Sequence, residues 1–297
     1  MSDRSTVHVG MAGLLALAAT YGLGRQAYGL FVPAFRTEFA LDLDAIGYLA
    51  GAAQFGYLVA TVATGIVAAR YGPRVPVVAG CILLTVGALL VATAQTTVTL
   101  TVGLILAGTS AGGAWSPFSD AVAQRVPEGR QRRALALVNA GSPFGLVIAS
   151  LLVALTGSTW RLAWGAFAVV GLVAALVNAF VLPRHPPGRA AKVQYGWAGL
   201  LAPAALRLFA VAALASVTSG AYFAYAPEAA QAAGLPSWIG AAMWGVLGVG
   251  GFVVGALGGE IADRFSLGGP LAVTWLAGAT GPLPPENASA ISVTKLI

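Results

Sequence analysis

The stretch GIVAARYGPR, residues 65–74, ends one long apolar run and leads directly into the next. A similar stretch, GEIADRF, occupies residues 259–265, so the two begin 194 positions apart. The same offset relates AYGLFVP at residues 27–33 to AYFAYAP at residues 221–227. These matches predict an internal duplication, with one copy of the charged turn in each half of the chain.

The composition around these stretches indicates a membrane protein. Of the 297 residues, 58% are hydrophobic and only 9% are charged, which is too few charges to cover the surface of a soluble protein. A spanning helix needs about 20 apolar residues, and the continuous apolar runs exclude the ten-residue alternation of a transmembrane barrel. We therefore predict an all-α, polytopic protein with spans at residues 9–31, 45–68, 75–94, 98–122, 134–156, 160–182, 204–226 and 237–259, and an incomplete run at 269–280.

The basic residues predict the orientation of these spans. If the N-terminus is cytoplasmic, twelve of the sixteen Lys and Arg residues fall in cytoplasmic stretches, whereas the outside loops carry only Arg36 and Arg161. The net charge of +6 therefore reports membrane topology and does not indicate nucleic-acid binding. We expect a multi-pass protein of the plasma membrane with its N-terminus in the cytoplasm.

A polar, Pro-rich and basic segment divides the spans into two blocks. Six spans precede it, and because six is even, the second block starts on the same side as the first, as in parallel repeats. The predicted organisation is a six-helix lobe at residues 1–182, a cytoplasmic linker at 183–203, an incomplete second lobe with two helices and part of a third at 204–280, and a polar, disordered or aberrant tail at 281–297.

The charged turn resembles the signature of the major facilitator superfamily, G-x-x-x-D-R/K-x-G-R-R/K between the second and third spans. Ala69 stands where the family usually has Asp, and the second copy keeps that acid but has Ser266 in place of the later glycine. The resemblance implies two lobes, transport by alternating access, and a cytoplasmic gate; for Arg70 and Arg74, ordinary positive-inside anchoring is the alternative. The positions that match or extend this gate are Gly65, Arg70, Gly72, Arg74, Asp120, Gly259, Asp263 and Arg264.

Asp120, near the cytoplasmic end of the fourth span, is expected to reach Arg74 or Arg133. Proton-coupled relatives often have an Arg before a Gln-Gly pair in that span, but Leu104 and Ala107 occupy those places here. The resemblance therefore does not indicate proton coupling through such an Arg.

Arg25 is the sharpest candidate for contact with a substrate. It lies inside the first span, where an uncompensated charge costs at least ~2.5 kcal/mol unless it faces water or a partner. It either meets an anionic group of the substrate or snorkels and pairs structurally. Glu228 is a coupling-ion site, a partner of Arg25 or a solvated rim carboxylate. The other cavity candidates, each of which is also explained by helix packing, are Gln26, Tyr28, Gln54, Tyr57, Trp115, Asn139 and Tyr222.

The predicted function is secondary active transport of a small organic solute by alternating access. No Walker pattern and no cluster of metal ligands occurs in the sequence, so we expect no enzyme activity, cofactor or metal. The polar tail GPLPPENASAISVTKLI supports an alternative, a truncated or frameshifted remnant or a membrane binding protein. Expected partners are the lipid bilayer, the solute, a coupling ion and another polypeptide that supplies missing helices, and no nucleic acid.

Overall fold

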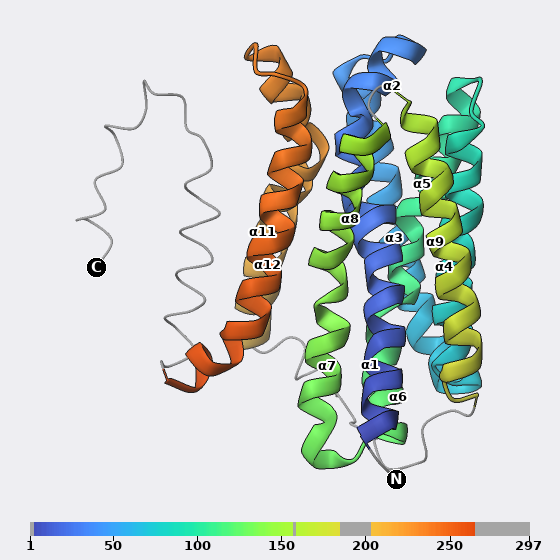
Figure 1. The fold of residues 1–297 in the computed structure, drawn as a ribbon, viewed down its shortest axis with the longest axis vertical. Coiled ribbons are helices and arrows are strands. Elements are labelled where there is room, and N and C mark those ends of the chain that lie inside the picture. Colours follow the sequence, from blue (N-terminus) through green and yellow to red (C-terminus); the bar gives the residue numbers. More distant parts are fainter. Residues whose placement is uncertain (1–2, 157–158, 185–202, 265–297) are drawn as a thin grey trace. The chain divides into compact units, whose positions relative to one another are not determined.

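A computed structural model of the chain describes residues 3–156, 159–184 and 203–264. These residues form helices joined by short turns, with no strand among them, so the prediction of an all-α protein is confirmed (Figure 1). In chain order the elements are α1 (Asp3–Leu17), η1 (Ala18–Gln26), η2 (Ala27–Phe31), α2 (Val32–Phe39), α3 (Leu43–Tyr71), α4 (Arg74–Ala92), α5 (Thr97–Thr109), η3 (Ser110–Gly113), α6 (Trp115–Arg125), η4 (Glu128–Arg130), α7 (Gln131–Asn139), α8 (Gly141–Thr156), α9 (Trp160–Val181), α11 (Pro203–Ala232) and α12 (Trp238–Arg264).

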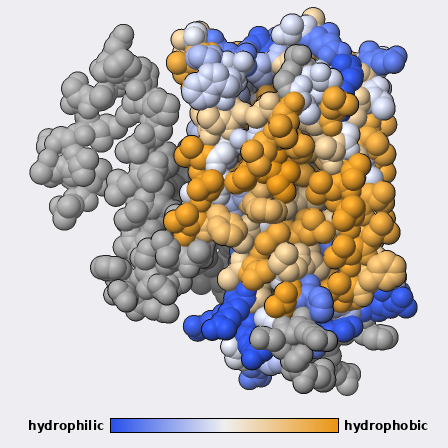
Figure 2. Space-filling view, in the orientation of Figure 1, coloured by the Kyte–Doolittle hydropathy of each residue, from blue (hydrophilic) through white to orange (hydrophobic). Residues whose placement is uncertain are grey.

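Among the described residues, six continuous helical segments are long and apolar enough to cross a membrane, and they overlap the first six predicted spans. They are Thr6–Phe39, Leu43–Tyr71, Arg74–Ala92, Thr97–Arg125, Glu128–Thr156 and Trp160–Val181. Figure 2 shows hydrophobic residues gathered around the middle of the visible face and hydrophilic residues at its two ends, the distribution that a bilayer requires. The exposed apolar side chains of α3, such as Phe55 and Val62, are thus suited to contact with lipid.

The helices α11 and α12 fall where the seventh and eighth spans are predicted. The chain through Phe252 forms one compact unit, and residues Val253–Ile297 form a second, of which the structure describes the end of α12. Most of the predicted linker, the partial span at 269–280 and the tail at 281–297 lie outside the described residues. The division into two lobes therefore stays a prediction.

Aromatic side chains pack the outer part of the first span against α9. The rings of Phe31 and Trp164 have centroids 5.5 Å apart, and those of Phe35 and Trp160 lie 5.0 Å apart. Phe167 completes the cluster at 5.3 Å from Trp164. Because Phe35, Trp164 and Phe167 are fully buried, this cluster holds η2 and α2 against α9.

Glycines set the closest approach between the first span and α8. A Cβ atom on Gly22 would lie 2.5 Å from the Cα of Gly145, closer than side-chain atoms pack. The glycine-rich stretch at residues 141–145 thus has a packing role, in which two backbones touch directly. This contact holds η1 against α8.

Candidate substrate cavity

The first span is not a regular α-helix where it carries Arg25. Its backbone forms a nine-residue π-helix, η1, and then a 3₁₀-helix, η2. A Cβ atom on Gly24 would lie 2.8 Å from the carbonyl oxygen of Ala107 and 3.0 Å from Oγ of Ser110, so η1 packs tightly on the fourth span, which itself tightens into η3. Such π-helical turns are rare and frequent at functional sites, because they change the direction in which side chains project.

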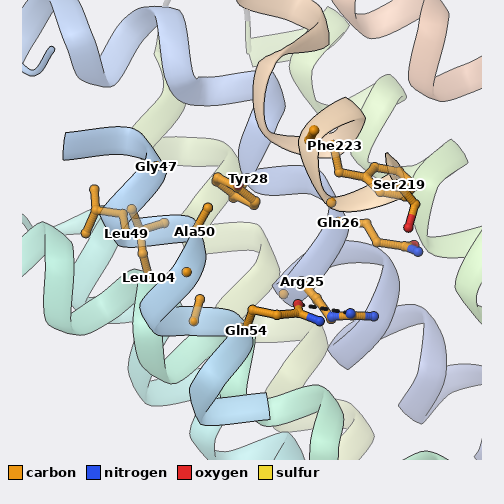
Figure 3. A pocket seen from close by; sticks show the side chains of 16 residues that line it. Arg25, Gln26, Tyr28, Gly47, Leu49, Ala50, Gln54, Leu104, Ser219 and Phe223 are labelled. Atoms are coloured by element: carbon orange, nitrogen blue, oxygen red, sulfur yellow. Dashed lines mark hydrogen bonds between the residues drawn. The ribbon is translucent and has the colours of Figure 1, made fainter. Parts of the chain in front are cut away.

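A cavity of about 520 Å³ lies beside η1. Residues of η1, η2, α3, α5 and α11 line it, and four of the predicted candidates are among them: Arg25, Gln26, Tyr28 and Gln54 (Figure 3). The sequence did not single out Ser219 and Phe223 of α11, which also line the cavity. Its volume is in the range of small-molecule pockets.

Neutral and aromatic groups surround the guanidinium of Arg25. Its Nη2 donates a hydrogen bond to Oε1 of Gln54 at 3.0 Å, and its Cζ lies 4.2 Å from the ring centroid of Tyr57 and 5.8 Å from that of Tyr21. The hydroxyls of Tyr21 and Tyr57 are 3.1 Å apart. Among the described residues no carboxylate forms an ion pair with Arg25, so its charge faces the cavity without a neutralising partner.

Gln26 ties the first span to later helices. Oγ of Ser142 on α8 donates to its side-chain oxygen at 2.9 Å, and Nε1 of Trp244 on α12 donates to its backbone carbonyl at 3.0 Å. Tyr222 stacks on Trp244 with ring centroids 5.9 Å apart and is not among the lining residues. The ring of Tyr222 thus supports the wall of the cavity and does not form its surface.

Trp115 and Asn139 are also placed outside the cavity lining. Nε1 of Trp115 donates to Oδ1 of Asn139 at 2.8 Å, which joins α6 to α7. Their polar groups satisfy each other and contribute to helix packing, the alternative that the sequence left open.

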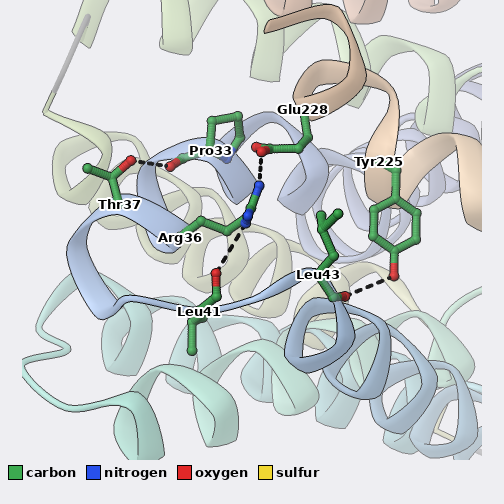
Figure 4. A network of polar contacts seen from close by, with 7 residues as sticks. All are labelled: Pro33, Arg36, Thr37, Leu41, Leu43, Tyr225 and Glu228. Carbon is green, nitrogen blue, oxygen red and sulfur yellow. Dashed lines mark hydrogen bonds and ion pairs between the residues drawn. The ribbon is translucent and has the colours of Figure 1, made fainter. Parts of the chain in front are cut away.

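Glu228 pairs with Arg36 and not with Arg25. The carboxylate on α11 meets Nη1 of Arg36 on α2, while Nε of Arg36 donates to the carbonyl of Leu41 at 3.1 Å (Figure 4). The Tyr225 hydroxyl donates to the carbonyl of Leu43 at 3.4 Å beside this pair. Arg36 and Glu228 both closely follow the matched segments at residues 27–33 and 221–227, but their separation of 192 differs from the repeat offset, so the repeat alone does not predict the pair.

The charged turn of the first block depends on its glycine, since Gly72 has φ 84° and ψ 170°, a region open to glycine alone. Arg70 lies over the ring of Tyr71 at 5.4 Å, and a Cβ atom on Gly65 would meet no described atom within 4 Å.

Asp120 does not form the expected ion pair. The structure describes Asp120, Arg74 and Arg133, and no ion pair joins them. Gly259, Asp263 and Arg264 lie at the end of α12, but their side chains are outside the described part of the chain. The cytoplasmic gate therefore stays a prediction.

The six helical segments of spanning length define a multi-pass membrane protein, and a cavity with a basic residue at its lining lies among them. The family profile of the Major Facilitator Superfamily matches residues 14–284, and the chain belongs to that superfamily. It is thus a member of a transporter family and not of an enzyme family. Among curated proteins, none matches the sequence significantly.

Solved structures show the same fold. The chain resembles a D-xylose-proton symporter with a TM-score of 0.64 and 16% identity, over 88% of this chain and 69% of that one. It resembles a peptide transporter (POT) with a TM-score of 0.51 and 18% identity, over 73% of this chain and 47% of that one. It also resembles a POT family transporter in complex with 5-aminolevulinic acid, with a TM-score of 0.51 and 15% identity, over 72% of this chain and 47% of that one. The chain therefore spans between about half and two thirds of these proteins.

Proposed function

We propose that this chain takes part in secondary active transport of a small organic solute that carries a negatively charged group. The observation that carries the proposal is the guanidinium of Arg25, which pairs with no carboxylate of the described residues, at a cavity of about 520 Å³ within the spans. The similar structures include sugar and peptide transporters, which supports a small polar solute as the cargo.

The surroundings of Arg25 favour an anion. Holding a positive charge at membrane depth costs free energy that a carboxylate or phosphate in the cavity offsets. The ring of Tyr57 and the amide oxygen of Gln54 orient the guanidinium but leave its net charge in place. The lining also has apolar side chains, including Leu49, Ala50 and Phe223, which fit the carbon skeleton of an organic solute.

Alternating access requires the two ends of the cavity to open in turn. The contact of Arg36 with Glu228 holds the first span to α11, and that of Tyr225 with Leu43 holds the second span to α11, both at the end that the basic residues predict to be outside. We propose that these contacts close the outer entrance, and that the cytoplasmic turn at residues 65–74 takes part in closing the other. The N-terminus in this scheme is cytoplasmic, the membrane is the plasma membrane, and a coupling ion or a further polypeptide completes the cycle.

The test is uptake by the purified full chain in liposomes, using pools of labelled organic anions, neutral sugars and organic cations. We expect anion uptake that Arg25→Gln abolishes and Arg25→Lys partly retains, because lysine keeps the charge but not the planar donors. Arg132→Gln, which removes an exposed arginine outside the cavity, is the matched control. Anion uptake that is equal in Arg25→Gln and the unchanged protein contradicts the proposal.

Ligand binding without uptake is the outcome that favours the alternative of a membrane binding protein. Quenching of tryptophan fluorescence by the anion, measured in detergent, reports binding independently of transport. Binding that disappears in Arg25→Gln, with no uptake by any variant, supports the binding protein and excludes transport by this chain alone.

A further inference from the structure

Three arginines from distant parts of the sequence meet at a second, smaller pocket. Arg74 is the first residue of α4, Arg125 is the last residue of α6, and Arg184 follows the end of α9. Together with Ala179, Phe180 and Leu182 they line a space of about 230 Å³. None of these residues lines the cavity beside Arg25, so the pocket is separate from the proposed transport site.

Among the described residues, the three guanidinium groups have no acidic partner. No carboxylate lines the pocket, and none of the ion pairs among the described residues involves these arginines. Ala69 leaves the turn at residues 65–74 without any acidic side chain. Like charges that share one concavity repel one another, so the pocket is stabilised by an anion that they bind together.

The start of α4 adds to the positive potential. Its N-cap is Pro73, whose side chain makes no capping hydrogen bond, so the first backbone N–H groups of the helix are not satisfied by a cap. The N-terminal end of a helix carries a partial positive charge and favours anions, phosphates above all. Arg74 therefore contributes both a side chain and a helix end to the pocket.

The apolar part of the lining places the pocket at the membrane boundary. The span formed by α9 ends at Val181, and Phe180 beside it is 83% exposed, as expected of a ring that meets lipid. The arginines thus lie where phospholipid headgroups lie, with an apolar ring on the hydrocarbon side. By the distribution of basic residues this is the cytoplasmic leaflet, which is rich in anionic lipid.

We propose that the pocket of Arg74, Arg125 and Arg184 binds the phosphate group of an anionic phospholipid. The guanidinium groups contact the phosphate oxygens, since their planar donors match a phosphate better than an ammonium does. The side chain of Phe180 packs along the first part of an acyl chain. A bound lipid of this kind joins the ends of α4, α6 and α9.

Native mass spectrometry of the full chain in detergent tests this site with short-chain phosphatidylglycerol, phosphatidylcholine and inorganic phosphate as probes. Each arginine near an anionic lipid contributes about fivefold in affinity, so the triple change Arg74→Gln, Arg125→Gln and Arg184→Gln is expected to weaken phosphatidylglycerol binding on the order of 100-fold. The matched control triple, Arg132→Gln, Arg133→Gln and Arg207→Gln, removes the same charge from exposed positions outside the pocket and is expected to keep the affinity.

A single change, Arg184→Gln, is expected to leave the fold intact because this exposed residue follows the last turn of α9, so it tests the site even if the triple variant misfolds. It is expected to lower the affinity about fivefold. Three results overturn the proposal: equal loss in the control triple, equal binding of phosphatidylcholine, or unchanged affinity in Arg184→Gln. Inorganic phosphate that binds as tightly as the lipid overturns it as well, because the site then takes free phosphate.

Discussion

Arg36 of α2 and Glu228 of α11 form an ion pair although they lie 192 residues apart in the sequence. Their side chains are 31% and 19% exposed, so the pair is partly shielded from solvent. It lies next to the contact between Tyr225 and Leu43, so the end of the first span and the start of α3 are both held against α11. This relationship connects the two halves of the predicted duplication.

Breaking the pair is expected to open the cavity toward the side we assign as the outside. In a Cys81→Ala background, Ala50→Cys places a thiol in the cavity lining. Adding Glu228→Gln is expected to raise the rate at which an impermeant maleimide labels this thiol about 5- to 10-fold, because the closed state loses ~1 kcal/mol of ion-pair stabilisation. The exchanged pair, Arg36→Glu with Glu228→Arg, is expected to restore slow labelling. Unchanged labelling in Glu228→Gln contradicts the closing role.

Tyr57 is expected to support Arg25 through its ring and not through its hydroxyl. Tyr57→Ala removes a ring centred 4.2 Å from the guanidinium and is expected to weaken anion binding about 10-fold, in line with a desolvated cation–π contact. Tyr57→Phe loses only the hydroxyl contact with Tyr21 and is expected to bind within about twofold of the unchanged protein. Equal losses in the two variants, measured by fluorescence titration, argue against the cation–π contact.

The contact between Gly22 and Gly145 is expected to tolerate no added methyl group. Gly22→Ala places a Cβ 2.5 Å from the Cα of Gly145 and is expected to destabilise the fold by about 1–3 kcal/mol. Gly165→Ala is the control, because a Cβ there meets nothing within 4 Å, and we expect no loss of stability. Thermal unfolding in detergent gives the comparison, and a Gly22→Ala melting temperature equal to that of the control refutes the close approach.

Glu38 is expected to hold the end of the first span to α9. Its Oε2 accepts hydrogen bonds from Nε1 of Trp160 at 2.9 Å and Nη1 of Arg161 at 3.0 Å, and Arg161 also donates to the carbonyl of Ala94 at 2.7 Å. Glu38→Gln weakens these charge-assisted bonds and is expected to lower the melting temperature by a few degrees, less in high salt. Glu128→Gln, an exposed acid in η4, is the control; an equal shift there would point to net charge alone.

The membrane spans were predictable because their signal is local. The free energy of transferring a run of about 20 apolar residues into lipid depends on that run alone and not on the neighbouring spans. Arg25 was found because a charge inside an apolar run is costly wherever the run packs.

The partners of the polar residues were much less predictable. Trp115 and Asn139 satisfy each other, and Asp120 forms no ion pair with Arg74 or Arg133. Whether a polar side chain meets a cavity or another side chain depends on how helices are rotated about their axes, and the apolar spans carry little periodicity to set that rotation. The π-helical winding of η1 also changes the direction in which the following side chains point, and no residue pattern in the sequence predicted it.

The sequence by itself determined that this chain crosses a membrane several times, approximately where the first six spans lie, and that it resembles the major facilitator superfamily, because hydrophobic length and short charged turns act within a few residues. Only the tertiary structure decided which polar groups face the cavity, that Glu228 pairs with Arg36, and that Arg74, Arg125 and Arg184 share one pocket. These relationships depend on the packing of helices far apart in the chain, and that packing is set by glycine contacts and helix rotation rather than by any single segment.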